Sequence, residues 1–305
     1  MIIFLIRRLQ LSIVVILGVS IVVFLISRIS GDPAQLMLSM YATQEDIAAF
    51  RQIMGLDDPL LVQYWNFLSH ALQGDFGNSY MHHLPVSYLI MTHLPATLKL
   101  AVVSMTISVI IGVPAGVIIA INKGSYIERI GMLLALFGQS APVFWLGLML
   151  ILVFSVRLQW LPAGSSGTWK HIVLPAITLA SWSITMITRV TYSSMVDVLQ
   201  KNYITVAHAK GLHRRMVFVR HALKNALIPV ITLVGLRFGV VLGGAVVTET
   251  VFAWPGMGRL AINAVYNRDY PLIQGTVLIV AVGFVLISTV LDIIYRYIDP
   301  RVRLE

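Results

Sequence analysis

Six apolar runs, each about twenty residues or longer, fill most of this sequence. They occupy residues 9–29, 96–121, 130–156, 172–191, 226–248 and 272–295. A helix of about twenty apolar residues crosses the hydrocarbon core of a bilayer, where every backbone amide needs a partner within the protein. Only 11% of the 305 residues are charged, whereas soluble domains contain roughly 25%. The sequence therefore predicts an all-α, polytopic membrane protein with six transmembrane helices.

The distribution of the 22 lysines and arginines orients these helices. Six spans place both termini on one side, and fourteen cations belong to that side, in segments 1–8, 122–129, 189–225 and 296–303. Seven belong to the other side, and Arg237 falls inside the fifth run. Positive charge accumulates in cytosolic loops, so we expect cytosolic N- and C-termini. The pI of 9.9 follows from this topology and predicts no nucleic-acid partner, because the cations are not gathered on one soluble face.

Residues 197–229 form a polar, basic island between the fourth and fifth runs, with six cations and one acid. Within it, Tyr203 to Lys210 has helical composition, Gly211 is placed as a helix stop, and a second helix begins near His213. The pattern fits two interpretations. One is a basic loop that obeys the charge rule above. The other is a docking element for a cytosolic partner.

The segment after the first run, residues 31–95, is acidic and is predicted to lie outside. Thr43 with Asp46 resembles a capping box, Gly55 a helix stop and Pro59 a new start, which predicts short helices over 44–54 and 59–72. An apolar face of the second helix would consist of Val62, Trp65, Phe67 and Leu68. We expect this helix to lie on the outer membrane surface or to cover the outer mouth of the protein.

Small residues and prolines predict how the membrane helices pack. Gly112 and Gly116 in the second run are spaced for a close helix contact. The fifth run has the same spacing at Gly235, Gly239 and Gly243. Proline interrupts helical hydrogen bonding, so Pro114 and Pro142 are expected to kink the second and third helices.

A few polar side chains in the runs or at their ends are candidates for a pathway or gate. They are Arg237, Glu249, Gln139 and Ser183. A mid-membrane arginine costs about 2.5 to 3.5 kcal/mol, so Arg237 should face a partner or a wet cavity. Each of these groups either lines a polar route or bonds across helices.

Motifs for chemistry are missing from the sequence. It contains no P-loop, no zinc-protease motif and no nucleophile elbow, and it has no cysteine for a thiolate metal site. Neighbouring histidines such as His82 and His83 point apart on a regular element, so we predict no metal site.

The chain resembles the permease subunits of bacterial ATP-binding-cassette importers, in the peptide, opine and nickel branch. The strings that carry the resemblance are GDFG at 74–77, LPATL at 94–98, AHAKGL at 207–212, RHALKNA at 220–226, ETVFAWPGMGR at 249–259 and RDYP at 268–271. The likeness covers essentially the whole chain. The long outer loop after the first helix resembles the first of the two permeases in such systems.

The resemblance implies a type I importer transmembrane domain in a bacterial inner membrane. It divides the chain into 1–95, a helix plus a periplasmic loop, and 96–305, a five-helix permease core. A coupling helix at Tyr203 to Met216 would seat in a separate ATPase subunit. The residues expected to carry this contact are Tyr203, Ala207, Lys210, Gly211, Leu212 and Arg214. The family's docking motif has Glu-Ala-Ala where this chain has Thr205, Val206 and Ala207, so a glutamate and one alanine are replaced.

The implied partners are a homologous second permease, two ATPase subunits, an external substrate-binding protein and membrane lipid. This chain would be no enzyme and would hold no cofactor, because ATP and magnesium bind the ATPase. Trp254 would belong to the outer mouth formed by Glu249 to Pro271. Short peptides are the first expectation for the substrate, with glutathione, opines or nickel as alternatives. A self-sufficient secondary transporter is the competing hypothesis, although no inverted repeat supports it.

Overall fold

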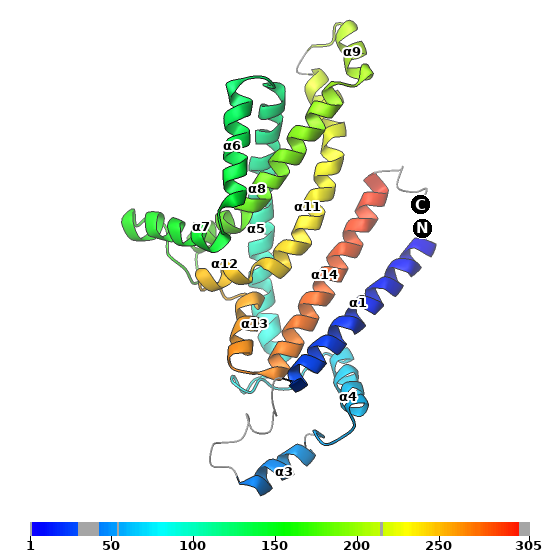
Figure 1. The fold of residues 1–305 in the computed structure, drawn as a ribbon, viewed down its shortest axis with the longest axis vertical. Helices are drawn as coiled ribbons and strands as arrows, with labels where there is room; N and C mark the ends of the chain where they lie inside the picture. The colour runs from blue at the N-terminus through cyan, green and yellow to red at the C-terminus, as the bar shows by residue number, and fades with distance from the viewer. Residues whose placement is uncertain (1, 30–42, 54, 214–215, 299–305) are drawn as a thin grey trace. The chain divides into compact units, whose positions relative to one another are not determined.

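A computed structural model describes residues 2–29, 43–53, 55–213 and 216–298, and Figure 1 shows the course of the chain. Within these residues, five helices are long and apolar enough to cross a membrane, and a bent helix pair makes up to six spans. The chain divides into two compact units, one of residues 1–96 and 255–286, the other of residues 97–254 and 287–305. The division falls inside two of the long helices.

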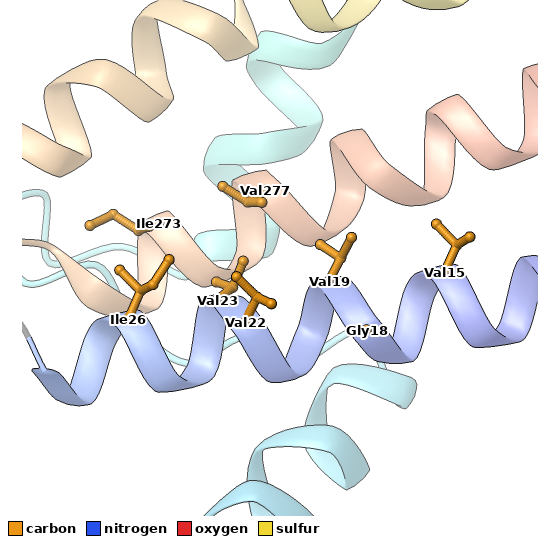
Figure 2. Close-up of a pocket in the computed structure, with 8 residues that line it drawn as sticks. All are labelled: Val15, Gly18, Val19, Val22, Val23, Ile26, Ile273 and Val277. Atoms are coloured by element: carbon orange, nitrogen blue, oxygen red, sulfur yellow. The ribbon is translucent and has the colours of Figure 1, made fainter.

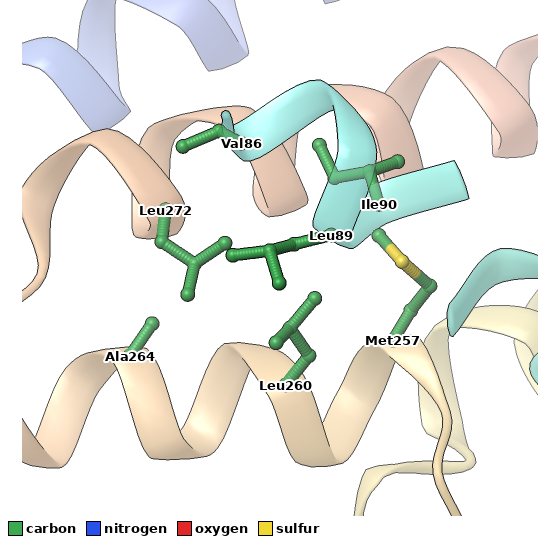
Figure 3. Packing of buried hydrophobic residues seen from close by; sticks show 7 residues of the cluster. All are labelled: Val86, Leu89, Ile90, Met257, Leu260, Ala264 and Leu272. Carbon is green, nitrogen blue, oxygen red and sulfur yellow. The ribbon is translucent and has the colours of Figure 1, made fainter. Parts of the chain in front are cut away.

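The first unit contains the N-terminal span and the outer segment. Its helices are α1 (Ile2–Ile29), α3 (Gln44–Ile53), α4 (Leu60–Leu72), the start of α5 (Val86–Ile121), α13 (Met257–Tyr266) and most of α14 (Tyr270–Ile298). The core lies where α13 packs on the beginnings of α5 and α14, as Figure 3 shows. Leu89, Ile90, Leu260 and Leu272 are all buried there. On another side, α1 and α14 leave an apolar groove of about 550 Å³ lined largely by valines (Figure 2).

Both helices predicted after the first span are confirmed. The capping box at α3 forms as expected, since the Thr43 amide and hydroxyl donate to the Asp46 carboxylate at 2.9 and 2.7 Å and the Asp46 amide donates to Thr43 Oγ1 at 3.2 Å. These hydrogen bonds lower the pKa of Asp46 from its ordinary value. Gly55, which follows α3, has φ +62°, a conformation that a side chain disfavours.

A buried carboxylate organises the end of this unit at which α14 begins. Asp269 is fully buried immediately before α14. Its oxygens accept hydrogen bonds from the Ser79 hydroxyl at 2.5 Å, the Met81 amide at 3.2 Å and the Leu272 amide at 3.3 Å. Asp269 thereby caps α14 and holds the 79–81 turn against it. Burial, with a smaller contribution from Asp269, raises the pKa of the neighbouring Tyr80 to about 12.

The second unit is a helix bundle arranged around α8 (Lys170–Leu199). The remainder of α5, α6 (Tyr126–Ser140) and α11 (Lys224–Gly244) complete its long helices. In Figure 1, α6 and α11 lie on opposite sides of α8. Apolar side chains of α5, α8 and α11 meet in one core that includes Met105, Ile187 and Val230. The short helix α12 (Val246–Val251) follows α11.

The third predicted span is broken rather than continuous. After α6 the chain forms α7 (Val143–Leu150), which continues as a π-helix, η1 (Ile151–Arg157). The axis of this second helix is bent by 100° from that of α6. Pro142 precedes α7 with ψ 135°, outside the helical range. The residue before a proline is also pushed toward extended conformations. The kink predicted at Pro142 is therefore confirmed in the stronger form of a helix break.

The close contact predicted at Gly112 and Gly116 is also confirmed. A Cβ added to Gly112 would lie 2.8 Å from Ile187 Cγ2, and one added to Gly116 would lie 2.5 Å from Thr191 Cβ and 2.6 Å from the Thr188 carbonyl oxygen. The backbones of α5 and α8 therefore touch where these glycines lie. On α11, Gly235 and Gly239 are buried, but a Cβ at Gly243 would meet nothing within 4 Å.

Gly116→Ala is expected to destabilise the protein by about 1 to 3 kcal/mol, because the added methyl group forces α5 away from the α8 backbone. Thermal unfolding of the purified chain in detergent measures this as a lower midpoint. Gly243→Ala is the matched control, since it makes the same change in a membrane helix where the space is open. Equal midpoints for both variants would contradict the proposed role of the contact.

Candidate functional site

The element predicted to be cytosolic begins where α8 ends at Leu199. The Lys201 amide donates to Val198 O and the Ile204 amide to Lys201 O, each at 3.0 Å, and the chain enters α9 (Asn202–Ala209). Gly211 then takes φ +73°, which stops the helix. Helical hydrogen bonding resumes from His213, whose carbonyl accepts from Met216 at 2.8 Å, and leads into the π-helix η2 (Val217–Leu223). The predicted sequence of helix, glycine break and helix is confirmed.

One face of α9 belongs to the core of the protein. Ile204 and Ala207 are 3% and 7% exposed, and they pack with buried residues from the ends of α5, α8, η2 and α11. These partners are Ala120, Met195, Val217, Ala222 and Ala226. Leu212 packs against the same cluster while partly buried. The cluster, which we call the coupling core, joins α9 to the ends of three membrane helices, α5, α8 and α11.

The opposite face of α9 is open. Tyr203 and Val206 are 42% and 52% exposed, and Lys210 and Gly211 are exposed as well. The Tyr203 hydroxyl accepts a hydrogen bond from Asn225 Nδ2 of α11 at 3.0 Å, so the base of this face is fixed to a membrane helix. An exposed apolar residue beside a tyrosine held in place is typical of surfaces that protein partners cover.

The structure divides the residues predicted for coupling. Tyr203, Lys210 and Gly211 lie on the open side, Ala207 faces the coupling core, and Arg214 lies outside the described residues. Sequence reasoning missed Val206. The helical period separates Val206 from Ile204 and Ala207, but it does not say which side of α9 is buried.

Arg237 has an aromatic partner that the sequence did not indicate. Its guanidinium carbon lies 3.8 Å from the centroid of the Trp182 ring, which α8 presents to α11. Arg237 is partly buried. The face of an indole ring attracts a cation electrostatically, an interaction worth about 0.5 to 2 kcal/mol. Ser183, next to Trp182, is 2% exposed and therefore lies inside the bundle.

Gln139 contacts a second arginine near the broken span. Its Oε1 accepts a hydrogen bond from Arg189 Nη1 at 3.0 Å, which links the end of α6 to α8. Two candidate polar residues, Gln139 and Arg237, therefore both contact α8, through Arg189 and Trp182. This helix also connects directly to α9 through the turn at Lys201.

Glu249 and Trp254 are both buried in the second unit, at 0% and 3% exposure. Thr97 Oγ1 of α5 donates to Glu249 Oε1 at 2.7 Å, and the Trp254 amide donates to the Glu249 carbonyl at 2.8 Å. Thr97 was missed as a partner because it lies 152 residues away in the sequence. Within the described ranges, no group of three or more His, Asp or Glu residues could hold a metal ion.

Two family models match almost the whole chain. The model described as "Binding-protein-dependent transport system inner membrane component" matches residues 112–304, and the model of its N-terminal part matches residues 1–101. The chain belongs to this family. It is an inner membrane permease of a binding-protein-dependent ATP-binding-cassette importer, in the dipeptide and oligopeptide branch.

Curated relatives of this permease share its full length. It is 43% identical over 301 residues to the glutathione transport system permease protein GsiC of Salmonella choleraesuis (strain SC-B67), which covers 98% of each chain. The protein of the same name from Escherichia coli (strain K12) is 42% identical with the same coverage.

Solved importer structures share its fold. The MetNI methionine transporter, in an inward-facing crystal form, aligns over 70% of this permease and 97% of its own chain, with 20% identity and a TM-score of 0.59. An amino acid transporter with histidines aligns over 69% and 94%, with 19% identity and a TM-score of 0.53. The expected type I importer fold is confirmed.

Proposed function

We propose that this permease forms half of a translocation pathway and that α9 is the element on which a separate ATPase subunit acts. The support is the two-sided structure of α9. Its inward face is part of the coupling core, which joins the ends of α8 and α11, and its outward face exposes Tyr203, Val206 and Lys210. A push on a short rigid helix held in this way moves two membrane helices together.

The proposed complex contains a homologous second permease, two ATPase subunits and an external substrate-binding protein in a bacterial inner membrane. ATP hydrolysis takes place on the ATPase subunits in this proposal. The family to which the chain belongs is defined by dependence on a binding protein, and the similar structures are components of ATP-binding-cassette transporters.

We propose a short peptide as the substrate, with glutathione as the first candidate to test. Glutathione is itself a tripeptide, and a permease that is 43% identical over nearly the full length is described as a glutathione permease. Nickel and opines remain the other candidates of this branch.

Purification from native membranes tests the proposed assembly. A tagged chain should bring with it a second permease and an ATPase with measurable hydrolysis. Recovery of the chain alone, together with uptake driven by an ion gradient, would support a secondary transporter instead. Uptake of labelled glutathione, a labelled dipeptide and labelled nickel by the intact system then separates the substrates.

Arg237→Leu is expected to lower uptake severalfold without loss of the protein from the membrane. Removing a charge from a span lowers the cost of insertion by about 2.5 to 3.5 kcal/mol, so stability should not suffer. The variant loses the cation that lies over the Trp182 ring. We propose that this cation lines the pathway together with Gln139 and Ser183. Transport assays in cells check this, with Arg237→Lys as the variant that keeps the charge.

Normal uptake by the leucine variant would remove Arg237 from the pathway. Glu249 and Trp254 belong to the proposed outer gate rather than to this group. Both are buried, so we propose that such a gate would move as a packed segment.

A further inference from the structure

Three faces of α4 differ in chemistry. At 100° per residue, Leu61, Trp65, Leu68 and Leu72 fall within one narrow stripe. Leu61, Trp65 and Leu72 are 83%, 68% and 81% exposed. Asn66, Ser69, His70 and Gln73 lie on a separate, mostly polar face that also carries Val62, and Gln63, Tyr64 and Phe67 lie on a third. The apolar face predicted from Val62, Trp65, Phe67 and Leu68 is therefore wrong, because these residues fall on three different faces of α4. Leu68 is partly buried, so the stripe is a largely exposed apolar surface among the described residues.

The third face fixes α4 against the N-terminal span. The Tyr64 hydroxyl and Ser20 Oγ are hydrogen-bonded at 2.8 Å, and the Phe24 ring packs edge-on against Tyr64 and in a stack against Phe67, with centroids 5.5 and 6.0 Å apart. Ser20 and Phe24 are almost completely buried by these contacts and their neighbours. Gln63 adds a second anchor, since its Nε2 donates to Leu56 O and Asp58 O at 2.9 and 2.7 Å.

The position of these contacts along α1 gives the depth of α4. The apolar span of α1 runs from Ile6 to Arg28. At 1.5 Å per residue, Phe24 and Ser20 lie about 6 and 12 Å from Arg28 along the helix axis. The Arg28 guanidinium lies 5.3 Å from the Phe24 ring, one helical turn back along the span. The part of α4 that contacts α1 is therefore level with the outer part of the hydrocarbon core.

We propose that α4 is embedded in the outer leaflet beside α1, with its Leu61 to Leu72 stripe in contact with lipid acyl chains. The polar face that includes Asn66 and Ser69 then faces the headgroups and water. This placement puts Trp65 near the boundary between acyl chains and headgroups, where indole rings concentrate. The occupant is lipid because the contacts with Ser20 and Phe24 hold this part of α4 beside the apolar span of α1, where a surface that the chain itself leaves uncovered meets acyl chains.

Nitroxide scanning tests this placement. The chain has no cysteine, so each variant carries a single label. Leu61→Cys and Leu72→Cys report on the stripe, Asn66→Cys and Ser69→Cys are the matched controls on the polar face, and Val22→Cys is the lipid-exposed reference on α1. The labelled full chain is placed in nanodiscs of phosphatidylethanolamine and phosphatidylglycerol. Collision with oxygen is then compared with collision with a water-soluble nickel chelate.

The stripe labels should show an oxygen-to-nickel accessibility ratio close to that at Val22 and severalfold above that at Asn66 and Ser69. A ratio at Leu61 and Leu72 equal to the polar-face value would overturn the proposal, because α4 would then stand in water. Low access to both reagents would also overturn it, because the stripe would then be covered by protein.

A second measurement needs no label on α4. Acyl-chain brominated lipids should quench the tryptophan fluorescence of the unmodified chain more than that of Trp65→Tyr, because Trp65 would lie within reach of the bromines. If the quenched fraction is the same in both proteins, Trp65 does not contact lipid and the proposal fails.

Discussion

Uptake is expected to fall by at least about tenfold in Gly211→Pro, while the protein remains folded in the membrane. Gly211 ends α9 with φ +73°, and proline is restricted to φ near −65°. The chain must therefore leave α9 along a different path, which displaces the open face of the helix. Gly211 itself is exposed, and an added Cβ would meet nothing within 4 Å, so the change should spare the packed core.

The measurements are uptake in cells, the amount of chain in the membrane, and the ATPase recovered with the purified protein. We expect normal membrane amounts with little associated ATPase. Full uptake in Gly211→Pro would show that α9 does not transmit the ATPase movement.

A neighbouring pair of substitutions separates docking from folding. Val206→Glu places a carboxylate on the open face, and Ala207→Glu places the same group in the coupling core, where Ala207 is 7% exposed. Truncation or disruption of an interface anchor costs about 2 kcal/mol or more, roughly thirtyfold in affinity. Val206→Glu should therefore lose the ATPase at an unchanged thermal midpoint, and Ala207→Glu should lower the midpoint.

The structure thus changes the expectation for Ala207. On the sequence alone, Ala207→Glu is a docking variant. In the fold it is a core variant, because burying an uncompensated charge is strongly destabilising. If both variants lose only the ATPase, the orientation of α9 described above is wrong.

Asp269→Ala is expected to destabilise the first unit by about 3 to 5 kcal/mol. The carboxylate is fully buried and accepts hydrogen bonds from Ser79, Met81 and Leu272. Alanine leaves these three donors without an acceptor, and each buried unsatisfied donor costs about 1 to 3 kcal/mol. The start of α14 loses its cap in the same step.

Thermal unfolding in detergent and limited proteolysis of residues 74–85 measure this loss. Asp269→Asn should recover part of the stability, because its amide oxygen still accepts a hydrogen bond. Asp57→Ala is the exposed control, because it removes a surface ion pair between Asp57 and Arg51. The side chains of Arg51 and Asp57 are 40% and 57% exposed, and such pairs contribute about 1 kcal/mol or less. Equal losses at Asp57 and Asp269 would contradict the structural role of the buried group.

The sequence by itself determined the properties that follow from local pattern. Apolar length predicted the spans, because a bilayer accepts only helices that satisfy their own backbone. The capping box at Thr43 and Asp46, the glycine stop at Gly211, the break at Pro142 and the close contact at Gly112 and Gly116 all follow from steric and hydrogen-bonding rules over a few residues. The motifs from residue 74 to residue 271 also predicted the family correctly.

The tertiary structure alone decided which side chains meet across long sequence separations. Arg237 lies over Trp182, Glu249 accepts from Thr97, and Asp269 gathers Ser79 and Met81 from 190 and 188 residues away. No local pattern contains these pairs, because they depend on which helices pack and in which rotation. The same reason explains why the sequence did not show that Ala207 is buried and Val206 exposed. Helical period places them on different faces, but only the packing of α9 on α8 and α11 decides which face is buried.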